Sequence, residues 1–85
     1  MIEITVTQYT KHQVDDIVID YYKCDSETEA AHWVKDSWDN ECDDMFGDNP
    51  INIIKLTNEI KNKAVVVIET PYCSDTQIDW TIIKH

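Results

Sequence analysis

The hydrophobic and polar positions of the chain follow two periods, one typical of strands and one typical of a helix. Residues 2–8 alternate, with Ile2, Ile4 and Val6 on one side and Glu3, Thr5 and Thr7 on the other, which predicts a half-buried β-strand. Residues 17–23 are rich in β-branched and aromatic side chains and predict a second strand. Because only a short polar segment separates the two, we expect them to pair as an antiparallel hairpin.

A helix is predicted over about residues 27–46. Ser26 and Glu29 have the spacing of a capping box, in which the Ser26 hydroxyl accepts from the Glu29 N–H and the Glu29 carboxylate reaches back to the Ser26 N–H. Gly47 supplies a stop signal. One sector of the helical wheel is apolar and is expected to face a sheet. Its members are Ala30, Ala31, Val34, Trp38, Cys42 and Met45.

Three further strands are predicted after the helix, over residues 52–57, 63–70 and 77–84. Short polar turns would link them as a meander. Residues 51–61 have a second interpretation as a helix, because the preceding Pro50 is favoured in a first helical turn. The apolar residues of this segment fall on opposite sides of a helical wheel, so the strand is the expected structure and the helix the alternative.

The predicted order β-β-α-β-β-β places the chain in the α+β class, with one helix packed across an antiparallel sheet. With 85 residues, the chain is expected to form a single domain over residues 1–85. The phase of the helix predicts that Trp38 is buried against the sheet and that Trp33 is exposed.

The charge of the chain is unevenly distributed along the sequence. Residues 15–48 contain twelve acidic residues and two lysines, which accounts for the whole net charge of −10. The acids and lysines of the remaining chain balance. All basic residues are lysines, and their small number argues against direct binding of nucleic acid or of an anionic membrane. The charge instead favours a basic partner or high solubility.

The outer side of the predicted helix is acidic. Its carboxylates lie three or four residues apart and repel one another, at a cost of a few tenths of a kcal/mol for each pair. A solvated surface is one explanation; the other is a surface that binds a cationic partner, with an aromatic residue as an apolar anchor. The candidate partner-binding residues are Glu29, Trp33, Asp36, Asp39, Asn40, Asp43 and Asp44.

Regularly spaced carboxylates on a rigid helix can imitate the phosphates of a nucleic-acid backbone, which proteins engage through lysine and arginine. Such a helix would occupy a basic groove and exclude the nucleic acid from it. The hypothesis explains why the self-repulsion is tolerated, because a cationic partner relieves it.

No catalytic motif is present, and we expect neither an enzyme nor a cofactor. The histidines are scattered and lack a zinc-ligand spacing, and a single glycine excludes a glycine-rich phosphate loop. The acidic run over residues 39–44 lacks the pattern of a calcium-binding loop. Cys24 and Cys42 have acidic neighbours, which should raise the pKa of a thiol. Three widely spaced cysteines and no signal peptide indicate a cytoplasmic protein.

By its size, its acidity and its predicted order of elements, the chain resembles small phage-encoded inhibitors, notably anti-CRISPR proteins. The resemblance is one of pattern over the whole chain; it rests on no shared motif, and no functional residue is carried over from it. Several anti-CRISPR proteins use an acidic surface to block the nucleic-acid-binding site of a CRISPR effector. The resemblance therefore implies an inhibitor in the host cytoplasm that binds a CRISPR effector.

A second hypothesis belongs to another functional class. The chain could be a phage structural or assembly protein, or an interaction module that forms a homodimer through an exposed edge strand. The expected state is a monomer or a weak homodimer.

Overall fold

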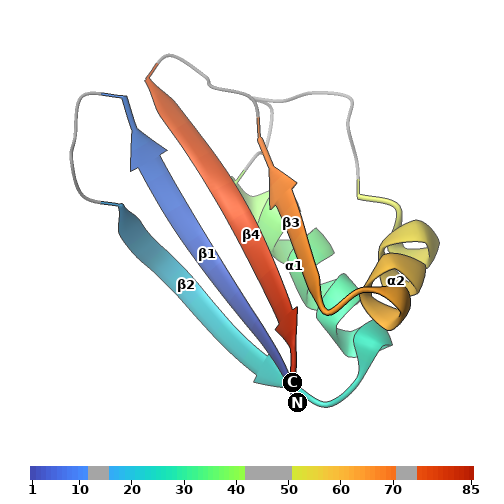
Figure 1. Cartoon of the computed structure of the whole chain (residues 1–85). Coiled ribbons are helices and arrows are strands. Elements are labelled where there is room, and N and C mark those ends of the chain that lie inside the picture. The colour runs from blue at the N-terminus through green and yellow to red at the C-terminus, as the bar shows by residue number, and fades with distance from the viewer. Residues whose placement is uncertain (12–15, 42–50, 71–74) are drawn as a thin grey trace.

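The computed structural model describes residues 1–11, 16–41, 51–70 and 75–85. It is an α+β fold of two layers, with a four-stranded antiparallel sheet and both helices on one of its faces (Figure 1). The predicted fold class and the antiparallel sheet are confirmed. The elements are β1 (Ile2–Thr10), β2 (Ile17–Cys24), α1 (Glu27–Glu41), α2 (Ile53–Asn62), β3 (Val65–Glu69) and β4 (Thr76–Lys84).

The strand order in the sheet is β2-β1-β4-β3, so the first and last strands of the chain form its centre. β1 pairs with β4 along its whole length, from Ile2 opposite Lys84 to Thr10 opposite Thr76. The termini consequently meet at one end of the sheet (Figure 1), where the His85 N–H donates to the Met1 carbonyl at 2.8 Å. The predicted hairpin of β1 and β2 is also present.

Residues 53–62 form a helix, so the predicted strand over residues 52–57 is wrong and the alternative is right. Asn52 caps this helix, since its side-chain oxygen accepts from the Lys55 N–H at 3.0 Å. The inward positions have the helical spacing i, i+3, i+4, i+7; they are Ile53, Leu56, Thr57 and Ile60.

The apolar residues of this segment fall on opposite sides of a helical wheel because one inward position is a threonine and one outward position is an isoleucine. The isoleucine is Ile54, which is 77% exposed. The corrected order of elements is β-β-α-α-β-β, with four strands instead of five. The predicted strands over residues 63–70 and 77–84 correspond to β3 and β4.

Helix α1 begins as predicted. The Ser26 hydroxyl accepts from the Glu29 N–H at 3.4 Å, which is half of the capping box. The Glu29 carboxylate does not complete the box; it accepts from the Tyr22 hydroxyl at 2.9 Å. The helix is described as far as Glu41, and the predicted continuation to residue 46 lies outside the described residues. The inward positions Ala30, Ala31, Val34 and Trp38 are buried as predicted, whereas Cys42 and Met45 lie outside the described residues.

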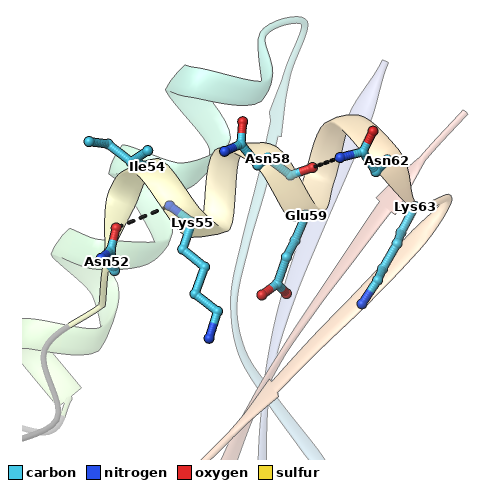
Figure 2. A pocket seen from close by; sticks show the side chains of 7 residues that line it. All are labelled: Asn52, Ile54, Lys55, Asn58, Glu59, Asn62 and Lys63. Carbon is cyan, nitrogen blue, oxygen red and sulfur yellow. Dashed lines mark hydrogen bonds between the residues drawn. The ribbon is translucent and has the colours of Figure 1, made fainter.

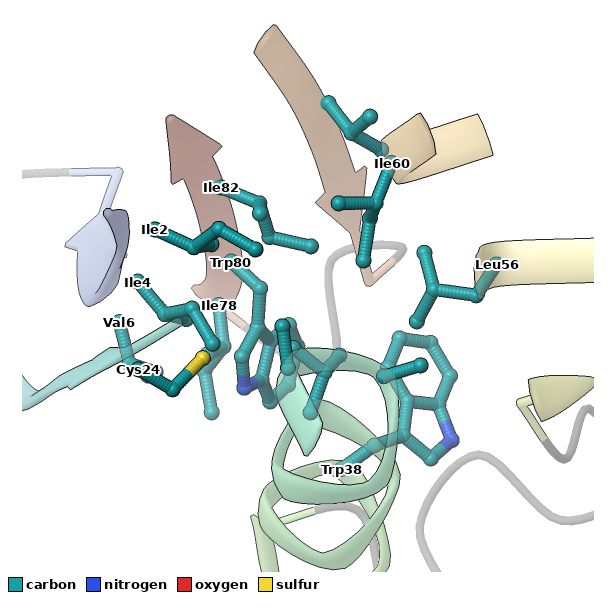
Figure 3. Close-up of a cluster of buried hydrophobic side chains, with 14 residues drawn as sticks. Ile2, Ile4, Val6, Cys24, Trp38, Leu56, Ile60, Ile78, Trp80 and Ile82 are labelled. Atoms are coloured by element: carbon teal, nitrogen blue, oxygen red, sulfur yellow. The ribbon is translucent and has the colours of Figure 1, made fainter. Parts of the chain in front are cut away.

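The core lies between the sheet and the helices, with Trp80 of β4 at its centre (Figure 3). Trp80 is fully buried, and its ring lies 5.2 Å from the ring of Trp38 in α1, centroid to centroid. A buried indole N–H needs an acceptor. The Trp80 Nε1 donates to the Ser37 hydroxyl of α1 at 2.8 Å, which joins the helix to the middle of the sheet.

Candidate binding surfaces

The outer side of α1 carries four of the predicted site residues in one row. Glu29, Trp33, Asp36 and Asn40 have the spacing i, i+4, i+7, i+11, which places them along one side of the helix. Glu29, Asp36 and Asn40 are exposed. Asp43 and Asp44 lie outside the described residues. Four of the five described residues of the predicted site therefore form one continuous stripe on α1, and the fifth, Asp39, lies beside it.

Trp33 is half-buried, so the prediction that it is exposed is wrong. Its ring stacks on Tyr22 of β2, with ring centroids 5.0 Å apart and planes 6° apart. The same Tyr22 donates its hydroxyl to Glu29, and this hydrogen bond, followed by burial, raises the pKa of the tyrosine. Because this bond and this stack fix the orientation of Trp33, the residue joins α1 to the edge strand and presents only part of its ring to a partner.

Asp36 and Asp39 are exposed carboxylates of the predicted site, and Asp36 is the more freely presented of the two. Asp39 pairs with Lys35 one turn away, with 2.7 Å between the Lys35 Nζ and the Asp39 carboxylate. This contact raises the pKa of Lys35. Both side chains are substantially exposed, so the pair contributes little to stability. Asp36 has no hydrogen bond or ion pair within the described part of the chain.

The charge separates the described molecule into two regions. Residues 16–41, which hold β2 and α1, contain eight acidic residues and two lysines. Residues 51–70, which hold α2 and β3, contain three lysines and two glutamates. We call these the acidic region and the basic region. Figure 1 shows β2 at one edge of the sheet and α2 with β3 at the other, while α1, which carries most of the acidic residues, lies beside α2.

A shallow groove of about 510 Å³ follows the outer side of α2 (Figure 2). Its lining is made of carboxamides, lysines, one carboxylate and one isoleucine, without a histidine, cysteine or hydroxyl group. The residues are Asn52, Ile54, Lys55, Asn58, Glu59, Asn62 and Lys63. The groove was not predicted, because residues 52–57 were expected to form a strand. Asn52, which has the residue type and position of a helix N-cap, was the signal that could have revealed it.

The face of the sheet away from the helices is open and mixed in character. Asp79 of β4 lies opposite Glu69 of β3, and its Oδ1 atom is buried without a hydrogen-bond partner in the described residues. Burial and, secondarily, the charge of Glu69 raise the pKa of Asp79, while a hydrogen bond from Tyr9 lowers it. The described residues contain no group of three or more side chains placed to hold a metal ion.

The prediction that acidic surroundings raise the pKa of a thiol is confirmed for Cys24. Burial is the largest cause of the raised pKa; the hydrogen bond to Ser26 acts against it, and the charges of Glu29 and Asp25 add to it. The thiol also donates to the Ser26 carbonyl at 3.5 Å. Cys24 is therefore a core residue with a protonated thiol, poorly suited to act as a nucleophile.

None of the described helices is long and apolar enough to cross a membrane. Comparisons with protein-family models, with curated proteins and with solved structures found no match to this chain.

Proposed function

We propose that this protein is a non-catalytic inhibitor that docks the acidic side of α1 on a basic, nucleic-acid-binding surface of another protein. The observation that carries the proposal is the set of exposed carboxylates on the outer side of α1, which are Glu29, Asp36 and Asp39. Following the anti-CRISPR resemblance, the partner is a CRISPR effector in the host cytoplasm, and the inhibitor excludes DNA or RNA from it.

The rigidity of the stripe supports this proposal. The inward side of α1 is buried on the sheet, and the Ser37–Trp80 hydrogen bond and the Trp33–Tyr22 stack fix its rotation. Carboxylates on a helix held in this way keep constant spacing, so they can match cations that are arranged for phosphates without first losing conformational entropy. The repulsion among the carboxylates is relieved when a cationic surface covers them.

The experiment measures binding of labelled target DNA by a purified CRISPR effector in the presence of the protein. Asp36→Lys on α1 and Glu59→Lys on α2 form a matched pair, because each changes the charge by the same amount on a helix surface. We expect Asp36→Lys to weaken inhibition by about tenfold and Glu59→Lys to leave it unchanged. The double variant Asp36→Lys/Asp39→Lys should abolish inhibition while the circular-dichroism spectrum stays native.

Salt dependence provides the second measurement. Association of an acidic surface with a basic one is steered over about 8 Å at physiological ionic strength, so its rate should fall as salt increases. Equal loss of inhibition in the two matched variants, or a rate that does not respond to salt, would show that the acids of α1 are only a solvated surface.

A phage structural or homodimeric module is the second candidate function. One observation favours it: β3 is an edge strand with exposed apolar side chains, Val65 and Val67.

A further inference from the structure

The two edge strands of the sheet differ in regularity. A bulge between Val6 and Thr7 interrupts the pairing of β1 with the edge strand β2. The pairing of β3 with β4 runs without interruption from Val65 to Glu69. Bulges are one means by which an edge strand avoids pairing with a further chain, so β3 is the edge that lacks this protection.

Strand β3 presents a row of outward backbone groups. The Lys84 N–H donates to the Ala64 carbonyl, and the Thr70 N–H donates to the Ile78 carbonyl. The even-numbered residues of β3 therefore bond to β4, and the odd-numbered ones direct their N–H and C=O groups out of the sheet. Among the described residues, these outward groups have no backbone partner. They belong to Val65, Val67 and Glu69.

A cavity of about 230 Å³ adjoins this edge, between α2 and β3. Figure 1 shows α2 beside β3, at the edge of the sheet. Pockets for small molecules measure about 300–1,000 Å³, so this cavity has the size for a side chain and not for a whole ligand. Its lining residues are Ile51, Asn52, Lys55, Leu56, Glu59 and Ile68. We call the space between α2 and the β3 edge the α2–β3 cleft.

The floor of this cavity is apolar. Leu56 is 4% exposed, and Ile51 and Ile68 are half-buried and packed against the core. Ile68 has its side chain on the helix-covered face of β3, because it alternates with the exposed Val67. A strand placed next to β3 also points every second side chain to this face. One of those side chains would lie next to Ile68 and in reach of the cavity.

Polar side chains of α2 form one rim of the cleft. Lys55, Glu59 and Lys63 project from the same side of the helix (Figure 2) and follow one another at four-residue intervals. Four residues of a helix span about 6 Å. Side chains on one face of a strand are about 6.6–6.8 Å apart. An extended chain beside β3 therefore meets this rim at nearly its own spacing.

Charge and side-chain shape along the edge define the segment that fits. Glu69 lies at one end of β3, and Lys63 precedes the other end. Between them, Val65 and Val67 are 51% and 50% exposed. In an antiparallel segment, a basic residue lies opposite Glu69, and β-branched residues lie opposite the two valines. A large aliphatic residue points to the cavity, and an acidic residue follows near Lys63.

We propose that the α2–β3 cleft binds an extended segment of a partner protein, which adds to the sheet as a fifth strand antiparallel to β3. The backbone of the segment bonds to Val65, Val67 and Glu69, and one aliphatic side chain fills the cavity. Addition of a peptide to a free sheet edge is an established mode of recognition, in which backbone bonds give affinity and pockets give specificity. Because α2 lies beside this edge, the occupant is a single strand without a helix layer of its own. The proposal goes beyond the proposed inhibitory function and does not depend on it.

Two synthetic peptides of equal composition test the proposal. The matched peptide is acetyl-Lys-Leu-Val-Thr-Val-Glu-amide, and the control, acetyl-Glu-Leu-Val-Thr-Val-Lys-amide, exchanges the two charges. We expect the matched peptide to bind with a Kd of about 0.1 mM and the control to bind about tenfold more weakly. Titrations followed by amide chemical shifts measure both. The Val65 and Val67 amides should shift, and the Lys23 amide at the β2 edge should not.

Variants of the protein separate backbone pairing from charge. Lys63→Glu/Glu69→Lys reverses both ends of the cleft, so it should bind the control peptide more tightly than the matched one. Val67→Pro removes an outward N–H and leaves the bonds of β3 to β4 in place, so it should weaken binding of the matched peptide by about tenfold or more. Replacement of leucine by alanine in the peptide should have a similar effect, because the cavity then stays unfilled.

Four results would overturn the proposal. The first is the absence of any shift with about 1 mM of the matched peptide. The second is equal affinity for the two peptides, together with no reversal of preference in the charge-exchanged variant. The third is full affinity in Val67→Pro. The fourth is a shift of the Val65 and Val67 amides with protein concentration alone, since the occupant would then be a second copy of this chain.

Discussion

The two helices cover the same face of the sheet and differ in almost everything else. Helix α1 packs with four inward residues beneath the centre of the sheet and is joined to it by the Ser37–Trp80 hydrogen bond. Helix α2 is shorter, and Leu56 and Ile60 are its fully buried apolar residues. Outside, α1 has a net negative charge, whereas α2 has two lysines and one glutamate.

The comparison shows which properties the fold constrains. Both inward sides are set by the same core, so each helix must place small or apolar residues there at helical spacing. Neither outward side contributes much to stability, so its charge is free to serve another purpose. In this molecule the outward side of α1 is acidic, whereas that of α2 carries lysines. The following substitutions test whether the two helices also differ in their contributions to stability.

Truncation of Trp38, which packs α1 on the sheet, should have the largest effect on stability. Trp38→Ala removes a side chain that is 8% exposed and packed on Trp80, so we expect a loss of about 3–5 kcal/mol in the free energy of unfolding. Urea denaturation followed by circular dichroism measures it. Trp33→Ala is the control on the same helix; since it removes a half-buried, stacked ring, it should cost about 1 kcal/mol. Equal losses for the two variants would mean that the Trp33–Tyr22 contact stabilises α1 as much as the burial of Trp38 does.

The polar contact of α1 should cost more to remove than its counterpart in α2. Ser37→Ala leaves the buried Trp80 N–H without an acceptor, which should cost about 1–3 kcal/mol. Thr57→Val in α2 is the matched change, because the Thr57 hydroxyl donates only to the Ile53 carbonyl of its own helix at 2.7 Å. We expect Thr57→Val to be close to neutral in the same urea titration. A neutral Ser37→Ala would indicate that water replaces the serine.

Removal of the N-cap, in contrast, should cost more stability in α2 than in α1. Asn52→Ala removes a cap with a 3.0 Å hydrogen bond, and we expect a loss of about 1 kcal/mol. Ser26→Ala removes a longer bond of 3.4 Å and should cost about 0.5 kcal/mol. Thermal unfolding of both variants gives the comparison. If Ser26→Ala proved the more costly, the start of α1 and not that of α2 would depend on its cap.

The smallest effect has opposite signs on the two helices. Asp36→Asn removes the repulsion between Asp36 and Asp39 three residues on, so it should stabilise the fold by a few tenths of a kcal/mol. Glu59→Gln removes a carboxylate four residues from Lys55 and should destabilise by a similar amount. Both changes should vanish at 1 M salt, where charges are screened beyond about 3 Å. Two changes of the same sign would contradict the assignment of an acidic and a basic region.

Local patterns in the sequence determined a large part of this structure. The alternation along β1, the hairpin, the start of α1 and its inward residues all follow from spacing and capping, because each depends on residues within a few positions of one another. The acidic outer side of α1 follows in the same way. The raised pKa of Cys24 was also predictable, since its neighbours in sequence are acidic and its position is apolar.

Only the tertiary structure decided the remainder. Helix α2 forms because Ile53, Leu56, Thr57 and Ile60 fit the space beside α1, where a threonine can be buried by bonding to its own backbone. Trp33 is half-buried because β2 brings Tyr22 to it. The β1–β4 pairing, which creates the β3 edge, joins the two ends of the chain. Contacts between residues so far apart leave no periodic trace in a sequence, since the spacing of a strand records which side is buried but not which strand lies beside it.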